Sequence, residues 1–143
     1  MDFFKKIFAV LMGIISGSIT LSITDRVMTM IYPLPDYIYT TDKAALAEHY
    51  INTPVSAFAV MVAGWAAGGF IAGMLSTWLA PVLKPTYAYF CGLIFLCATI
   101  FYLLTNPGGP WWLWIAGILT WLPMAHIGFK TAADIKFRSI QKK

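Results

Sequence analysis

The chain has 143 residues, of which 59% are hydrophobic and only 11% are charged, and this balance excludes an ordinary water-soluble domain. Soluble domains of this size carry roughly 25% charged residues, whereas the mean hydropathy here is +0.73. The cations behind the formal net charge of +4 flank the apolar runs, so we interpret them as a topology signal and exclude nucleic-acid binding.

The first predicted element is an apolar helix over about residues 4–31. Lys5 and Lys6, followed by an apolar run, also occur at the start of secretory signal peptides. No A-x-A cleavage pattern follows, however, and the apolar character continues to Ile31. A hydrocarbon layer about 30 Å thick needs about 20 apolar residues of helix. Lipid cannot hydrogen-bond backbone N–H and C=O groups, so an isolated apolar run must pair them within a helix. We therefore predict an uncleaved first transmembrane helix, with a signal peptide as the alternative.

A polar stripe follows the second half of this helix at helical spacing. Its members are Ser18, Ser22, Asp25 and Thr29, with Arg26 beside them. Charged residues inside a span are costly in hydrocarbon and are candidates for a functional site. Two interpretations stay open. Either Arg26 reaches lipid phosphate while Asp25 accepts hydrogen bonds near the headgroups, or the stripe binds a ligand or an ion.

The outer loop over residues 32–53 is predicted to contain a short amphipathic helix. Thr41 or Asp42 can cap this helix, which runs to about Ile51. So short a helix is marginal alone, and we expect it to lie on the bundle or at headgroup level. Aromatic side chains on this side are expected to form a belt at the membrane surface. The belt residues are Tyr32, Tyr37, Tyr39, Tyr50, Trp111, Trp112 and Trp114.

Three further spans are predicted after this loop. They cover about residues 54–82, 85–105 and 110–129. Pro54 suits the first position of a helix, Pro81 and Pro85 separate the second span from the third, and the turn over 106–110 is rich in proline and glycine. The predicted fold class is therefore all-α: a four-helix transmembrane bundle that forms one domain over 1–143.

Small residues recur every four positions in the first two spans. The glycines concerned are Gly13 and Gly17 in the first span and Gly64, Gly68, Gly69 and Gly73 in the second. Because lipid provides little hydrophobic drive between helices, association depends on close backbone approach and hydrogen bonds. We predict that the first two spans pack on each other through these glycines. A glycine face left uncovered is predicted to bind a second membrane protein.

Two tryptophans and a histidine are further candidates for a ligand or ion site. Trp65 and Trp121 lie too deep for the surface belt, and each indole N–H needs a partner. Pro123 should kink the fourth span beside Trp121. His126, about one turn further on, either lines a pocket at this kink or hydrogen-bonds a neighbouring helix.

No catalytic or redox site is predicted. Cys91 and Cys97 lie six residues apart on different faces of one helix, so they cannot form a disulfide or a C-x-x-C pair. The sequence has no nucleophile motif, glycine-rich phosphate loop or metal-ligand cluster. We therefore expect no metal and no cofactor, and an enzyme is the least favoured class.

Orientation follows from the positions of the basic residues. One side of the predicted bundle carries Lys5, Lys6, Lys84, Lys130, Lys136, Arg138, Lys142 and Lys143. The opposite side carries an acidic excess. Because Lys and Arg are retained in the cytoplasm during insertion, both termini are predicted to be cytoplasmic. The segment 130–143 is predicted to be a basic, amphipathic extension of the fourth span that suits anionic headgroups.

Several motifs together resemble a family of small bacterial four-helix membrane proteins without a known activity. They are Asp25 followed by Tyr32-Pro33-x-Pro35, Asp42 with Ala45-Leu46, Tyr50-Ile51 and Pro54, Trp65-x-x-Gly68-x-Phe70-x-x-Gly73, and Leu122-Pro123. The resemblance covers nearly the whole chain and implies a multi-pass protein of the bacterial inner membrane. In that family a histidine commonly follows the acidic residue by one turn. Thr29 occupies that position here, which puts a metal role for Asp25 in doubt.

These observations predict a protein that acts by binding. The favoured hypothesis is helix–helix association, either as a homo-oligomer or as an accessory subunit of a membrane complex, with the lipid bilayer and other membrane proteins as partners. The alternative is transport of a small molecule or ion along the polar stripe of the first span.

Overall fold

The computed structural model describes residues 2–33, 35, 42–106 and 108–141, and within these residues all regular secondary structure is helical. The helices are α1 (Asp2–Ile31), α2 (Lys43–Asn52), α3 (Val55–Leu79), α4 (Thr86–Thr105) and α5 (Trp111–Gln141). α1, α3, α4 and α5 are long and apolar enough to cross a membrane. The predicted four-helix bundle with a short loop helix is confirmed, and the protein is a multi-pass membrane protein.

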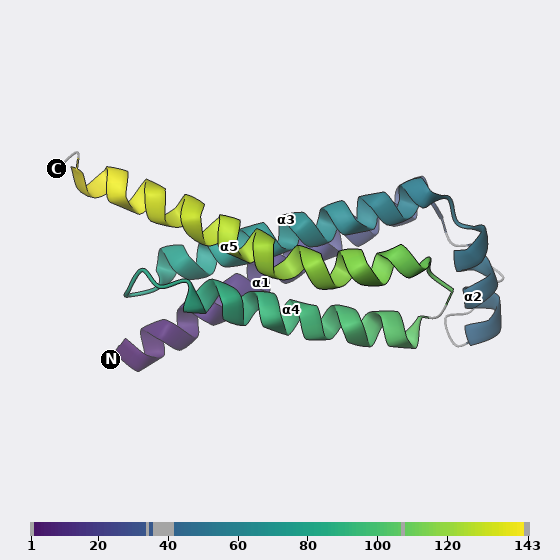
Figure 1. The fold of residues 1–143 in the computed structure, drawn as a ribbon, viewed down its shortest axis with the longest axis horizontal. Helices are drawn as coiled ribbons and strands as arrows, with labels where there is room; N and C mark the ends of the chain where they lie inside the picture. Colours follow the sequence, from purple (N-terminus) through teal and green to yellow (C-terminus); the bar gives the residue numbers. More distant parts are fainter. Residues whose placement is uncertain (1, 34, 36–41, 107, 142–143) are drawn as a thin grey trace.

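The four long helices lie side by side and alternate in direction (Figure 1). Both chain ends emerge at one end of the bundle, which we call the termini end. α2 lies across the opposite end, which we call the α2 end (Figure 1). Tyr37 and Tyr39 of the predicted belt, and the last two lysines, lie outside the described residues.

Local signals explain where the helices begin and end. The Asp42 carboxylate caps α2 by accepting hydrogen bonds from the backbone N–H groups of Ala44 (3.1 Å) and Ala45 (3.2 Å). α3 ends at Leu79, three residues before the predicted boundary. The reason is Pro81, which disfavours the helical conformation at the residue before it, and Ala80 is extended with ψ of 141°.

α5 continues without interruption from the last span through the predicted tail. At 31 residues it is about 46 Å long, well beyond the hydrocarbon thickness. Pro123 lies inside it, and Figure 1 shows the C-terminal half diverging from the bundle. Lys136 ties this half back to α3, because its ammonium group lies 3.2 Å from the carbonyl oxygen of Ala80 and 3.4 Å from that of Trp78. A cation is thereby placed against the unpaired carbonyls at the C-terminal end of α3.

α3 is the central helix, and its small residues face two different neighbours. α1 packs mainly on α3 and only lightly against α4, whereas α5 packs on both α3 and α4. Toward α1, an added Cβ at Gly64 would meet the side chain of Thr24, and one at Gly68 would lie 3.5 Å from the carbonyl oxygen of Gly17. Toward α5, an added Cβ at Gly73 would meet the backbone of Ala125.

The remaining glycines of the predicted set are equally enclosed. A Cβ at Gly13 would lie 2.8 Å from the carbonyl oxygen of Ala72, and one at Gly17 would lie 2.7 Å from the ring of Phe95. At Gly69 the nearest atom belongs to Trp121, at 3.2 Å. The expectation of an uncovered glycine face is therefore wrong. All six glycines are buried against this chain's own helices, because α5 as well as α1 needs a close approach to α3.

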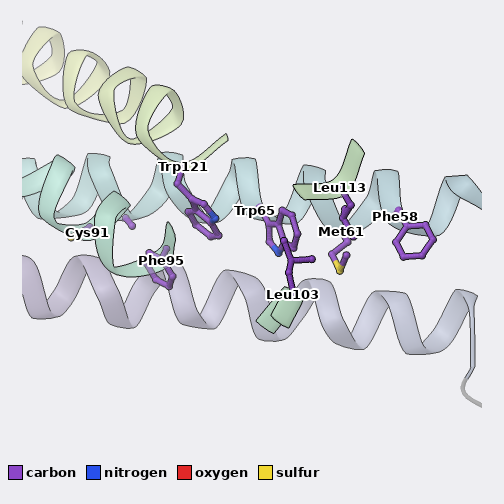
Figure 2. Close-up of a cluster of buried hydrophobic side chains, with 9 residues drawn as sticks. Phe58, Met61, Trp65, Cys91, Phe95, Leu103, Leu113 and Trp121 are labelled. Carbon is purple, nitrogen blue, oxygen red and sulfur yellow. The ribbon is translucent and has the colours of Figure 1, made fainter. Parts of the chain in front are cut away.

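Large side chains fill the centre of the bundle (Figure 2). Trp121 is fully buried and stacks on Phe95, with ring centroids 4.9 Å apart and an interplanar angle of 13°. Its indole N–H donates to the hydroxyl of Thr99 over 2.8 Å. This arrangement provides the partner that the sequence required for Trp121 and joins α4 to α5 at mid-bundle.

Candidate functional site

Two adjoining cavities lie in the half of the bundle nearer α2. The α5-side cavity, of about 270 Å³, lies between α2, α3, α4 and α5. The α1-side cavity, of about 200 Å³, lies between α1, α3 and α4. Met61 and Tyr102 line both, so their side chains stand at the boundary between the two spaces.

Helical spacing brings the lining residues of the α1-side cavity together. Leu21 and Asp25 are one turn apart on α1, and Met61 and Trp65 are one turn apart on α3. α4 contributes Phe95, Ala98, Thr99 and Tyr102. The walls are therefore mostly apolar or aromatic, with polar groups at separate points around them.

α2 forms the roof of the α5-side cavity. The hydroxyl of Tyr50 lies 3.1 Å from that of Tyr102, which links α2 to α4. The ring of Tyr50 also packs on Phe58 of α3, with centroids 6.3 Å apart. Gly108, at φ +112°, lies against the backbone of Ala47, where a Cβ would come within 2.6 Å of the Ala47 carbonyl oxygen. Only glycine readily adopts that conformation and leaves room for that contact.

The stacked pair of Phe95 and Trp121 closes the α1-side cavity toward the termini end. Phe95 lines the cavity, and Trp121 lies directly behind it with no exposed surface. Thr99 also lines the cavity, and its hydroxyl oxygen accepts a hydrogen bond from the indole N–H of Trp121. The cavity is therefore a closed-ended recess on this side.

Trp65 lines the α1-side cavity from α3 and packs against α5 with one edge of its ring. At that edge, a Cβ added at Gly117 of α5 would lie 3.0 Å from Cζ3 of Trp65. Nε1 occupies the opposite edge of the indole and so faces away from α5. Trp65 therefore contributes an aromatic wall to the α1-side cavity, with its indole nitrogen on the ring edge away from α5.

The predicted polar stripe of α1 divides at this site. Asp25, Ser18, Ser22 and Thr29 are all exposed on α1, but of these four residues only Asp25 lines the α1-side cavity. The Ser22 hydroxyl donates to the Ser18 carbonyl over 3.0 Å, and the Thr29 hydroxyl donates to the Asp25 carbonyl over 2.8 Å. Arg26 is exposed and is not part of the cavity wall. The stripe is therefore not a continuous path, and Asp25 is its one member at a cavity.

His126 lies away from both cavities, on the α4–α5 interface toward the termini end. Its Nδ1 lies 2.8 Å from the hydroxyl of Tyr89, and the two rings stack with centroids 5.7 Å apart. This contact matches the second of the two sequence interpretations, a hydrogen bond to a neighbouring helix. None of the three described cavities includes His126.

A third cavity at the termini end has a different character. It is a shallow space of about 490 Å³ lined by Phe4, Lys5, Ile7, Phe8, Leu11 and Leu79. Its walls belong to exposed apolar side chains of α1 and α3, as expected for a surface in contact with lipid. Among the residues that the structure describes, no cluster of three or more His, Cys, Asp or Glu is able to hold a metal ion.

The sequence identified Asp25 and Trp65 but missed the residues that complete the site. Tyr102 was absent from the prediction, and Tyr50 was assigned only to the surface belt. Thr99 and Tyr102 are three residues apart on an otherwise apolar helix. That spacing places two hydroxyls on one face of α4 and was the available signal.

Comparison of the chain with protein families, with curated proteins and with solved structures gives no match.

Proposed function

We propose that this protein is a non-enzymatic, multi-pass protein of a bacterial inner membrane that binds a small amphipathic molecule at the α2 end of its bundle. The adjoining cavities carry the proposal. They combine apolar and aromatic walls with a few convergent polar groups, which is typical of small-molecule sites. The polar groups include the carboxylate of Asp25, a residue type that is rare inside a span without a role.

The orientation within this proposal rests on the basic residues at the termini end. Lys5, Lys84 and Lys130 all belong to that end, which favours a cytoplasmic location for both termini. The α2 end then faces the outside. The assignment to a bacterial inner membrane rests on the resemblance to the family of small bacterial four-helix proteins.

The closed end of the α1-side cavity favours binding over conduction. A transport path would have to pass the stacked rings of Phe95 and Trp121, which are buried at mid-bundle. Interiors packed at this density leave no continuous route for water or ions. The recess is lined by α1, α3 and α4, and α1 and α4 have little mutual contact, so we infer that a molecule enters between these two helices.

Filling the recess tests the proposal. Ala98 lines the α1-side cavity from α4, so Ala98→Phe places a ring inside it. The protein is held in nanodiscs of zwitterionic lipid, and 2-(4-fluorophenyl)ethanol is added as a probe. We expect line broadening of its ¹⁹F resonance beyond that of empty nanodiscs, and we expect Ala98→Phe to abolish the excess.

Ala67→Phe is the matched control for this experiment. Ala67 is exposed on α3 and lines none of the described cavities, so its substitution adds the same ring outside the site. Wild-type broadening in the control and none in Ala98→Phe would support a bound molecule in the recess. Equal broadening in all three proteins would rule the site out.

A second candidate function is association through α1, with a second copy or as an accessory subunit of a larger membrane complex. Its support is the exposure of the Ser18, Ser22 and Thr29 side chains on α1, the least buried of the four candidate spans. Hydroxyl groups that face outward in a span form hydrogen bonds across helix pairs. Ser22→Leu is expected to reduce the mass of the detergent-solubilised protein, measured by light scattering. A wild-type protein that is already a monomer would contradict this candidate.

A further inference from the structure

We propose that the α1-side cavity selects amphipathic organic amines, with the protonated amino group at Asp25 and a flat apolar body against the aromatic walls. This inference rests on the proposed binding function and adds the chemical class of the bound molecule. It is carried by the charge of the lining, the nature of the walls, the size of the space and its position in the bundle.

The charge of the lining favours a cation. Among the described residues that line the two cavities, Asp25 is the one side chain with a formal charge, and no Lys, Arg or His contributes to either wall. The adjacent Arg26 lies outside the cavity wall, since neighbouring residues on a helix point in different directions. A carboxylate at the edge of a low-dielectric recess attracts a positive group more strongly than it would in water.

The hydrogen-bonding groups fit an amino group. The carboxylate of Asp25 and the hydroxyl of Tyr102 line the same cavity, and both oxygens can accept hydrogen bonds from an ammonium group. The hydroxyl of Thr99 already accepts the indole N–H of Trp121. A charge-assisted hydrogen bond to Asp25 would therefore be the principal polar contact of the bound amine.

The aromatic walls fit the rest of such a molecule. Trp65, Phe95 and Tyr102 all line the cavity. Aromatic faces attract cations and also stack on flat apolar groups. An inorganic cation fits less well, because Ca²⁺ and Mg²⁺ require several oxygen ligands and the described residues hold no cluster of acidic side chains.

The size of the space limits the bound molecule to about one ring and a short chain. The α1-side cavity measures about 200 Å³, below the usual range of pockets for drug-sized ligands. A longer molecule would have to enter the α5-side cavity by displacing Tyr102. That movement would break the contact between the hydroxyls of Tyr102 and Tyr50.

The position of Asp25 suits a molecule that arrives from the bilayer. α1 ends at Ile31, so Asp25 lies six residues, or about 9 Å along the axis, from the end of the helix. An amphipathic amine partitions with its charge near the headgroups and its ring in the hydrocarbon. Entry between α1 and α4 would place the amino group at Asp25 and the ring against the aromatic walls in that same order.

Three fluorinated probes of one shape test the charge preference. They are 2-(4-fluorophenyl)ethylamine, the neutral 2-(4-fluorophenyl)ethanol and the anionic 4-fluorophenylacetate, each titrated into protein in zwitterionic nanodiscs. We expect the amine to bind about tenfold more tightly than the alcohol, as expected for one charge-assisted hydrogen bond. The anion should bind more weakly than either.

Substitutions then locate the source of the preference. Asp25→Asn should lower the affinity for the amine to that for the alcohol, whereas Asp25→Glu should still bind the amine more tightly than the alcohol. Asp134→Asn is the matched control, because Asp134 is an exposed carboxylate on the C-terminal half of α5, far from the cavity. It changes the net charge by the same amount and should leave the preference intact.

The outcomes separate this inference from the proposed function. If amine and alcohol bind equally to the wild type, and Ala98→Phe abolishes both, the recess binds ligands but does not select amines. A preference that persists in Asp25→Asn would also overturn the inference. If Ala98→Phe affects none of the three probes, the binding function itself fails. The comparison of probes on the wild type needs no variant, so misfolding of Asp25→Asn would not leave the inference untested.

Discussion

The two ends of the bundle are built on opposite principles. Toward the termini end, α3 meets its neighbours through Gly73 and Ser76, and backbones approach so closely that no Cβ fits at Gly73. Toward the α2 end, large rings such as Tyr50, Trp65 and Tyr102 stand between the helices, and cavities remain beside them. Small residues thus fasten α3 to α5 near the termini end, while aromatic residues stand beside cavities nearer α2, where Gly64 still keeps α3 close to α1. The candidate site lies among these aromatic residues.

The largest expected effect comes from adding a methyl group at the close-packed end. Gly73→Ala should lower the free energy of unfolding by about 2–3 kcal/mol, because its Cβ would meet the backbone of Ala125 and force α3 and α5 apart. Unfolding can be followed by titration with sodium dodecyl sulfate from a mild detergent. Gly68→Ala is the control, since its Cβ would lie 3.5 Å from the nearest atom. Equal losses for the two variants would contradict a steric clash between a Cβ at position 73 and the backbone of Ala125.

An intermediate effect is expected at the boundary between the two ends. Trp121→Phe and Thr99→Val each remove one partner of the buried 2.8 Å hydrogen bond between α4 and α5. Each should destabilise the protein in the same titration. The double variant should lose about 1 kcal/mol less than the sum of the single losses, because the second change finds no bond left to break. Strict additivity would show that the hydrogen bond contributes nothing.

The smallest effect on stability is expected at the α2 end. Tyr50→Phe removes the hydroxyl that contacts Tyr102, and side-chain hydrogen bonds between helices of membrane proteins contribute about 0.6 kcal/mol on average. The same change frees Tyr102 to move between the two cavities. We therefore expect 2-(4-fluorophenyl)ethanol to exchange faster between its free and bound states, as measured by ¹⁹F NMR. The free energy of unfolding should change little. A loss of stability as large as that of Gly73→Ala would show that α2 fastens the bundle.

The fold could be predicted from sequence because lipid leaves few alternatives. Runs of about 20 apolar residues must be helices, and prolines such as Pro54 and Pro81 mark the boundaries within a few residues. The cap at Asp42 was one of two options that the sequence left open. The end of α3 was misplaced by three residues because hydropathy continues past Leu79, whereas the backbone changes conformation at Ala80.

The site was harder to predict because it depends on which faces of the helices meet. Periodicity placed Asp25 in a polar stripe. Asp25 and Ser22 are both exposed, and only the packing of α1 on α3 and α4 shows that Asp25 also lines a cavity whereas Ser22 does not. The glycines showed the same limit. Gly69 and Gly73 form a second four-residue series, offset by one residue from the series of Gly64 and Gly68. The sequence alone did not show that this second series faces α5. Tyr102 was missed because a single tyrosine near the end of a span is ordinary.

The contact of Lys136 with Trp78 and Ala80 has a consequence for how the protein is made. α3 leaves the ribosome before residue 136 is synthesised. The carbonyl groups of Trp78 and Ala80 therefore have no contact with the Lys136 ammonium group until α5 has been made. The final stretch of the polypeptide therefore completes a hydrogen-bonding arrangement begun near the middle of the chain. A reporter fused upstream of Lys136 would monitor a nascent protein in which the carbonyl groups at the C-terminal end of α3 still lack the contact with Lys136.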